Sequence, residues 1–194
     1  MRRTSTHLFV ALVVTGSVGA PAAAQTPYPL GPTTVQNLSG GLAVQLRSYT
    51  PAVPVSPVPV PQASFATPED SFVAHVSAMM AGDHAAWLNG WAAEDQARHR
   101  EADIQQGRTP ALWAQIWHRV LEGQTPVLFK RLDIRGYPVL AYRLVDATGR
   151  TTFRGWFACK REGSRWVATN DLADDATLHE FFEQLLAAEG GAHR

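Results

Sequence analysis

Apolar and polar residues alternate along the stretch from Pro126 to Asp171, and this pattern predicts β-strands. Successive side chains of an extended chain point to opposite faces, so a strand with one buried face shows a period of two. Four segments follow this pattern: residues 127–135, 139–145, 151–160 and 165–171. The turns between them are short, and short turns join neighbouring strands in opposite directions. We therefore expect an antiparallel sheet of four strands.

Before these strands, apolar residues recur every three or four positions, which predicts amphipathic helices. Thr67-Pro68 and Thr109-Pro110 each join an N-cap residue to a proline at the first helical position, so a helix should begin at both. Asp83 is expected to cap a short helix between them, and the charged segment 93–106 to form a helix on the surface. The helix that begins after Thr109 carries a wide apolar face, so it should lie against the sheet.

A last helix is expected to begin at Asp174 or Asp175, with a stripe of large apolar residues: Leu178, Phe181, Phe182, Leu185 and Leu186. Such a stripe must be covered, either by its own domain, which we favour, or by a second copy of the chain or another partner. Together the elements predict an α+β domain over residues 65–190. Its N-terminal helices pack on a four-stranded antiparallel sheet, and a C-terminal helix follows.

The first 64 residues differ in composition from this domain. Residues 1–24 have a basic start, a short apolar run and Ala22-Ala23-Ala24, which predicts a secretory signal peptide rather than a membrane anchor. Residues 25–64 are expected to form a proline-rich spacer, because prolines alternate with other residues from Pro51 to Pro61 and favour an extended polyproline II rod. A small hairpin is possible within residues 33–49. The mature protein should be periplasmic or secreted.

Charge and cysteine content narrow the function classes. Without residues 1–24 the chain has 15 basic and 17 acidic side chains, which argues against nucleic acid as a partner. Cys159 is the single cysteine, so no internal disulfide can form, and it lies within an expected strand as a buried, unreactive thiol. The stability of the domain must come from its core, for which six tryptophans and eight phenylalanines provide material.

The order of these elements resembles the nuclear transport factor two-like superfamily. The resemblance rests on two opening helices with a break at Met79-Met80-Ala81-Gly82-Asp83, a later aromatic-rich helix, and final strands with a Gly163-Ser164-Arg165-Trp166-Val167 hairpin. It covers residues 64–171. It implies a cone-shaped α+β fold in which a curved sheet wraps round the helices and leaves a pocket. The isomerase and polyketide-cyclase branches place a strand pair where this chain has the charged segment 93–106, and their catalytic residues do not map onto it.

Five residues are candidates for binding a ligand in such a pocket: Trp113, Trp117, His118, Tyr142 and Trp156. An isomerase or dehydratase would also need a base and a donor for developing negative charge. His99, His118 and Asp171 are the candidate bases, and Tyr142, Trp113 and Trp156 the candidate donors. Each has a plainer interpretation: His99 lies between two arginines and is expected on a solvated helix face, and His118 is expected at the rim. Tyr142 shares a strand face with Leu140 and Leu144, which favours a core position with its hydroxyl at the edge.

Motifs for other chemistry are missing from the sequence. No His-x-x-x-His pair or Glu-x-x-His cluster indicates a metal site, and no glycine-rich phosphate loop followed by Lys-Ser indicates a nucleotide. No Gly-x-Ser-x-Gly turn indicates a serine hydrolase. We therefore expect no metal and no cofactor.

Two functions of different classes remain, and a third is weaker. The first is a non-catalytic periplasmic binding or scaffold module whose aromatic-lined pocket or sheet face contacts a protein or small-molecule ligand. The alternative is a small isomerase, cyclase or dehydratase that acts in the same pocket. The third is recognition of an anion by arginines of the strands: Arg131, Arg135, Arg143 and Arg154.

Overall fold

The fold is described from a computed structural model, which places residues 28–38 and 41–191 and the side chains of residues 28–38 and 41–187. The predicted signal peptide, residues 1–24, lies outside the described residues. Over the described part of the chain, every helix is too short or too polar to cross a membrane.

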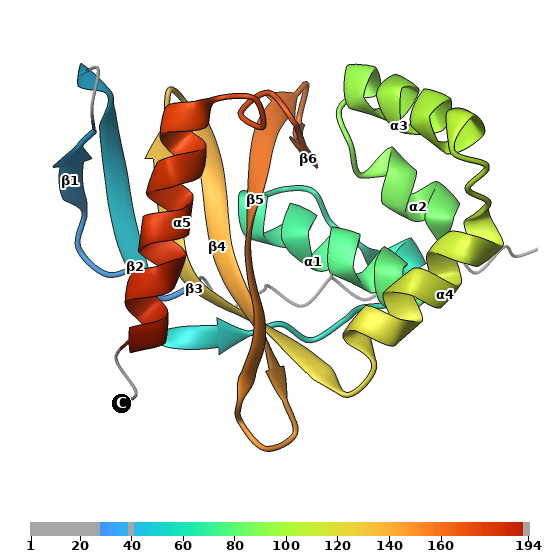
Figure 1. Ribbon diagram of the computed structural model, residues 1–194, viewed down its shortest axis with the longest axis horizontal. Coiled ribbons are helices and arrows are strands. Elements are labelled where there is room, and N and C mark those ends of the chain that lie inside the picture. Colours follow the sequence, from blue (N-terminus) through green and yellow to red (C-terminus); the bar gives the residue numbers. More distant parts are fainter. Residues whose placement is uncertain (1–27, 39–40, 192–194) are drawn as a thin grey trace, which may run out of the picture.

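A six-stranded antiparallel sheet forms the centre of the protein (Figure 1). Its strands lie side by side in sequence order, and each pairs only with strands next to it in the chain. The strands are β1 (Thr34–Asn37), β2 (Ala43–Pro54), β3 (Gln124–Ile134), β4 (Tyr137–Asp146), β5 (Thr151–Glu162) and β6 (Arg165–Ala168).

The protein is α+β, but the expected four-stranded sheet is wrong. Two additional strands, β1 and β2, come from the stretch that composition had marked as a spacer. Strand β2 pairs along β3 and is part of the core: the Val44 side chain is fully buried and Tyr49 is 4% exposed. The Tyr49 hydroxyl donates a 2.6 Å hydrogen bond to the buried Glu69 carboxylate, which also accepts from Arg131 of β3. Buried side chains and paired backbone groups outweigh the polyproline preference of this segment.

The sheet accommodates the prolines because of where they fall in β2. The register between β2 and β3 shifts between Ser48 and Val53, so Pro51 lies at an irregularity of the ladder. Pro54 is the last residue of the strand. Strand β1 pairs with β2 only over residues 43–46, so both prolines lie where β2 has no partner strand on its other side. At bulges and free edges, a missing backbone N–H costs no ladder hydrogen bond.

In the described part of the chain, four helices precede β3 and one follows β6. They are α1 (Pro68–Met80), α2 (His84–Asn89), α3 (Ala93–Gln105), α4 (Pro110–Leu121) and α5 (Ala176–Gly191), with a short 3-10 turn at Val60–Gln62. The caps expected from sequence are present: Thr67 accepts from the Asp70 N–H in a capping box, and Thr109 accepts from the Leu112 N–H. Asp83 caps α2 in the same way.

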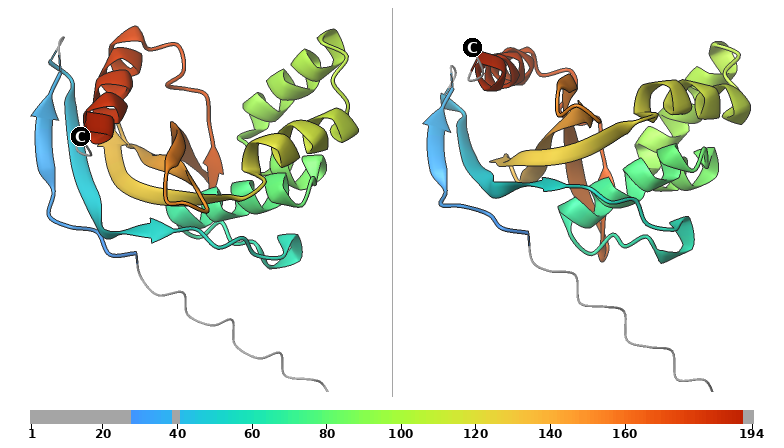
Figure 2. Two further views of the ribbon diagram at one scale, coloured as in Figure 1. Left: turned by 60° about the horizontal axis from the view of Figure 1, so that its bottom comes forward. Right: turned by 90° about the horizontal axis from the view of Figure 1, so that it is seen from below.

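Helices cover both faces of the sheet. Alternate side chains of β4 pack against helices on opposite faces. Val139 and Ala141 point to one face and pack in a cluster with Phe181 and Phe182 of α5. Leu140 points to the opposite face and packs with Phe72 of α1. Figure 2 shows α5 against one part of the curved sheet and the helices α1–α4 grouped at its other end. The apolar stripe of the last helix is therefore covered by its own sheet.

The contribution of β2 can be tested with two valines on neighbouring strands. Val44→Ala removes fully buried methyl groups and should lower the free energy of unfolding by about 1.5–3 kcal/mol. Val35→Ala, on a β1 side chain that is 62% exposed, should change it by less than about 0.5 kcal/mol. Urea denaturation measures both. Equal, small effects would show that residues 34–54 do not belong to the folded domain.

Candidate functional site

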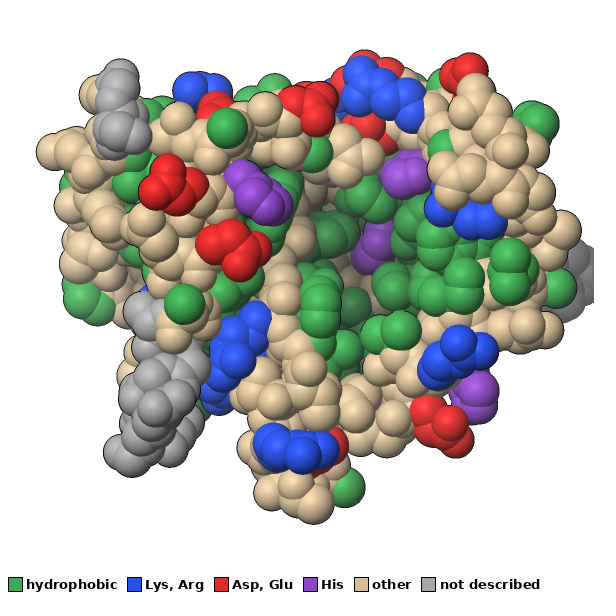
Figure 3. All heavy atoms as spheres, in the orientation of Figure 1, with side chains coloured by type: hydrophobic (Ala, Val, Ile, Leu, Met, Phe, Trp, Pro, Cys, Tyr) green, Lys and Arg blue, Asp and Glu red, His purple; other side chains and the backbone are tan. Residues whose placement is uncertain are grey.

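A cavity of about 420 Å³ lies between the helices α1, α2 and α4 and the strands β4 and β5. Figure 3 shows it as a hollow surrounded by hydrophobic side chains, open to the viewer. Five of the six tryptophans line it, together with Tyr142, His75 and three phenylalanines: Trp87, Trp91, Trp113, Trp117, Trp156, Phe72, Phe153 and Phe157. Aliphatic side chains from α1, α4 and β4 complete the wall.

Helical spacing explains why these side chains converge. On α1, Phe72, His75, Val76 and Met79 recur every three or four residues, and such positions share one face of a helix. On α4, Trp113, Ile116, Trp117 and Val120 do the same. The two faces look into one space, and the concave side of the sheet closes it.

Asp103 on α3 holds the tryptophan wall in place. Its buried carboxylate accepts a 3.1 Å hydrogen bond from the Trp113 indole and pairs with Arg108 at 2.9 Å. The His84 imidazole lies 3.1 Å from the same carboxylate. The rings of His84, Trp113 and Trp117 are stacked on one another, with Trp113 and Trp117 centroids 5.5 Å apart. This side of the pocket is therefore fixed by polar contacts outside it.

His75 lies in the pocket wall as a neutral imidazole. The Trp87 indole can only donate, and it donates a 2.7 Å hydrogen bond to Nε2 of His75, so the ring proton is on Nδ1. Burial lowers the pKa of His75 from 6.5 to about 3, and the nearby His99 adds to this effect. Within the described residues Nδ1 has no hydrogen-bond partner. His75 is thus a weak base whose lone pair is already engaged.

Tyr142 presents a hydroxyl group to the cavity. That hydroxyl makes no hydrogen bond to any described residue, and burial raises its pKa from 10.0 to about 12. Its ring lies over Gly155 of the paired strand: a Cβ at that position would be 3.0 Å from both the Cζ and the hydroxyl oxygen of Tyr142. Gly155 therefore leaves the space that Tyr142 occupies, and Tyr142 stays a neutral donor at physiological pH.

The structure brings four of the five candidate ligand-binding residues together. Trp113, Trp117, Tyr142 and Trp156 line the cavity. His118 does not: its side chain is 74% exposed and lies 3.5 Å from Glu122 on the same helix. The role of the four in binding a ligand stays a prediction.

Sequence reasoning missed several lining residues, above all His75, Trp87 and Trp91. The signal for His75 was present, because it falls three residues after Phe72 and four before Met79 on the apolar stripe of α1. A histidine at such a position counts as polar, so a search for apolar residues alone does not include it.

The expected position of His99 is wrong. Its ring is half-buried and packs against Trp91, with the centroids 4.4 Å apart, and against Trp87 at 5.0 Å. Burial lowers the pKa of His99. Asp171, the other candidate base, is exposed and accepts a 3.0 Å hydrogen bond from the Tyr137 hydroxyl. Neither residue lines the cavity.

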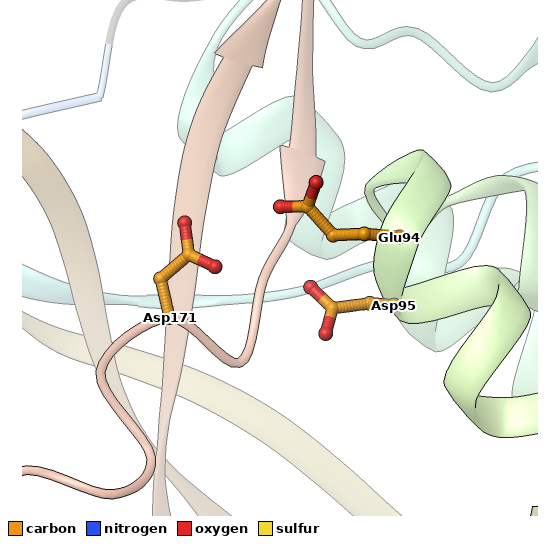
Figure 4. Close-up of side chains that lie close together, drawn as sticks. All are labelled: Glu94, Asp95 and Asp171. Atoms are coloured by element: carbon orange, nitrogen blue, oxygen red, sulfur yellow. The ribbon is translucent and has the colours of Figure 1, made fainter.

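Three carboxylates gather elsewhere, between α3 and the segment after β6. Oxygens of Glu94, Asp95 and Asp171 lie within 4.8 Å of one another (Figure 4). The Lys160 ammonium contacts both Glu94 and Asp171, and the buried Asp95 accepts from the backbone N–H of Asn170 at 3.1 Å. The cluster therefore has protein partners, and we assign it a structural role in joining α3 to the sheet.

Comparisons with protein-family models, with curated proteins and with solved structures find no match for this chain. The interpretation of the cavity therefore depends on its own geometry.

The pH dependence of stability tests the burial of His75. The unfolded chain takes up a proton near pH 6.5 and the folded chain only near pH 3, so the stability that neutral His75 provides is present above pH 6.5 and lost as the pH falls towards 3. The loss approaches about 1.4 kcal/mol per pH unit. His75→Gln, which cannot titrate but can accept from Trp87, should flatten the stability profile between pH 6.5 and 4.5 in urea denaturation.

His118→Gln is the matched control, because this exposed histidine should leave the profile unchanged. If His75→Gln and the unaltered protein lose stability in parallel over this pH range, the imidazole is not buried as described.

Proposed function

We propose that this domain binds a small, uncharged, ring-containing molecule in the aromatic cavity and does not transform it. The observation that carries the proposal is the composition of the wall: the described residues that line it are aromatic and aliphatic side chains, His75 and Tyr142, with no Asp, Glu, Lys or Arg among them. A charged ligand would lose its hydration there without a compensating partner. An apolar ring gains contact with several tryptophans at once.

The size and polarity of the cavity restrict the range of possible ligands further. A volume of about 420 Å³ lies in the range typical of sites for small molecules. The Tyr142 hydroxyl has no hydrogen-bond partner among the described residues, so it can donate one oriented hydrogen bond, for example to a carbonyl or ether oxygen of the ligand. We expect a mostly apolar ligand with a single acceptor group.

The alternative function, a small isomerase, cyclase or dehydratase, has one supporting observation. The Tyr142 hydroxyl could donate to an oxygen that gains negative charge. Such a reaction also needs a base, and His75 is the histidine of the wall. With a pKa of about 3 and its lone pair accepting from Trp87, it is poorly suited to take a proton at neutral pH. Binding without catalysis therefore explains the residues of the cavity wall better than an enzymatic reaction does.

The proposed setting is the periplasm or the exterior of the cell, on the basis of the predicted signal peptide at residues 1–24. Membership of the nuclear transport factor two-like superfamily likewise stays a proposal. A cavity between the helices and the concave sheet supports it, whereas strands β1 and β2 ahead of the helices are an addition to the expected arrangement.

Binding can be tested with the neutral fluorescent probe N-phenyl-1-naphthylamine. Five tryptophans line the cavity, so we expect energy transfer from them to the bound probe. Val120→Gln places a longer, polar side chain in the wall and should weaken probe binding at least about fivefold, because the amide group must be desolvated. Fluorescence titration measures the dissociation constant.

Leu112→Gln is the matched control. Leu112 and Val120 are both exposed apolar residues of α4, at 40% and 48%, but only Val120 lines the cavity. The control should bind the probe as the unaltered protein does. Equal affinities for all three proteins, or no binding at all, would count against a ligand site in this cavity.

A further inference from the structure

Two arginines lie opposite each other on the paired strands β4 and β5. Arg143 and Arg154 are direct partners in the strand register. They point to the sheet face that carries Ala141 and Trp156, which is the face covered by α5. Both side chains are partly buried, and the Nε atom of each is inaccessible to solvent.

Neither arginine has a counter-ion in the described part of the chain. Residues 28–38 and 41–187 provide no hydrogen bond and no ion pair to either guanidinium. Other partly buried arginines do have partners: Arg47 pairs with Asp133, Arg108 with Asp103, and Arg131 with Glu69. Within the described residues, Arg143 and Arg154 therefore differ from these three partly buried arginines.

The sequence had placed Arg131 and Arg135 in the same anion-binding set, and the structure separates them. Arg131 is engaged by Glu69 and Asp133, and Arg135 pairs with Asp175 at 2.9 Å. Of the four arginines, Arg143 and Arg154 have no partner among the described side chains.

Like charges at directly opposite positions of an antiparallel pair repel each other, and partial burial strengthens the repulsion. On the third strand the residue opposite Arg143 is the buried Val127, which offers no compensating charge. An anion between the two guanidinium groups would remove the repulsion and supply acceptors for the unpartnered donors.

We propose that Arg143 and Arg154 bind an oxyanion, a carboxylate or a phosphate group. A guanidinium presents its N–H donors in a planar fork that matches two oxygens of such a group, and two guanidiniums side by side can share one anion. The site is separate from the aromatic cavity, because neither arginine lines it. The two sites also lie on opposite faces of the sheet: the arginines share the face of Ala141, whereas Tyr142 and Phe157 of the cavity wall point the other way.

The oxyanion can be a phosphate or a carboxylate, and each is tested as a free ion, because the cavity lies on the opposite face of the sheet. Inorganic phosphate is the first probe. Acetate is the second.

The experiment compares the full chain with Arg143→Gln, Arg154→Gln and, as a control, Arg119→Gln. Arg119 is an exposed arginine on helix α4. Phosphate and acetate are each titrated at constant ionic strength and followed by amide NMR shifts. We expect each of the two strand variants to weaken the binding of phosphate or acetate at least about tenfold, and Arg119→Gln to leave it unchanged.

Thermal unfolding in chloride shows whether the variants are folded. Both strand variants should be at least as stable there as the unaltered protein, because each removes one of two repelling charges. The proposal is overturned if neither phosphate nor acetate binding depends on Arg143 and Arg154, or if Arg119→Gln has the same effect as the strand variants.

Discussion

The hydrogen bond from the Trp87 indole to Nε2 of His75 is the interaction on which the site depends. It joins α1 to α2 inside the aromatic layer, where His75 also packs against Trp91 and Phe157. Because the indole can only donate, the bond holds the imidazole neutral and fixes the proton on Nδ1. The same contact that organises the pocket wall thus removes its best candidate base from acid–base chemistry.

Rigid rings keep the cavity open. Side chains such as Trp113 and Trp117 cannot shorten or fold to fill a void as methionine can, and polar anchors outside the cavity hold them, chiefly Asp103. On the strand side, Gly155 gives Tyr142 the room to lie flat on the sheet. Residues that touch no ligand therefore determine the shape that a ligand would meet.

Much of the architecture could be predicted from local signals. Thr67-Pro68 and Thr109-Pro110 begin helices as expected, and the alternation after Pro126 does form strands. The two additional strands could not be found in this way, because the preference of Pro51 and Pro54 for an extended rod is local, whereas the burial of Val44 and the pairing with β3 are properties of the whole fold. Likewise, the spacing around Trp117 indicates an apolar helix face. The burial of His75 and His99 depends instead on how α1, α2 and α3 pack on one another around Trp87 and Trp91, which the pattern of a single helix does not show.

The most direct test of a non-catalytic binding site is an NMR titration of the His75 ring nitrogens in the folded protein. Long-range nitrogen–proton correlation spectra distinguish a protonated from an unprotonated ring nitrogen. We predict that between pH 8 and pH 5 Nδ1 carries a proton and Nε2 does not, as the lowered pKa requires. A titration of His75 with a midpoint near its ordinary value of about 6.5 would contradict the account, because the cavity would then contain a functional base.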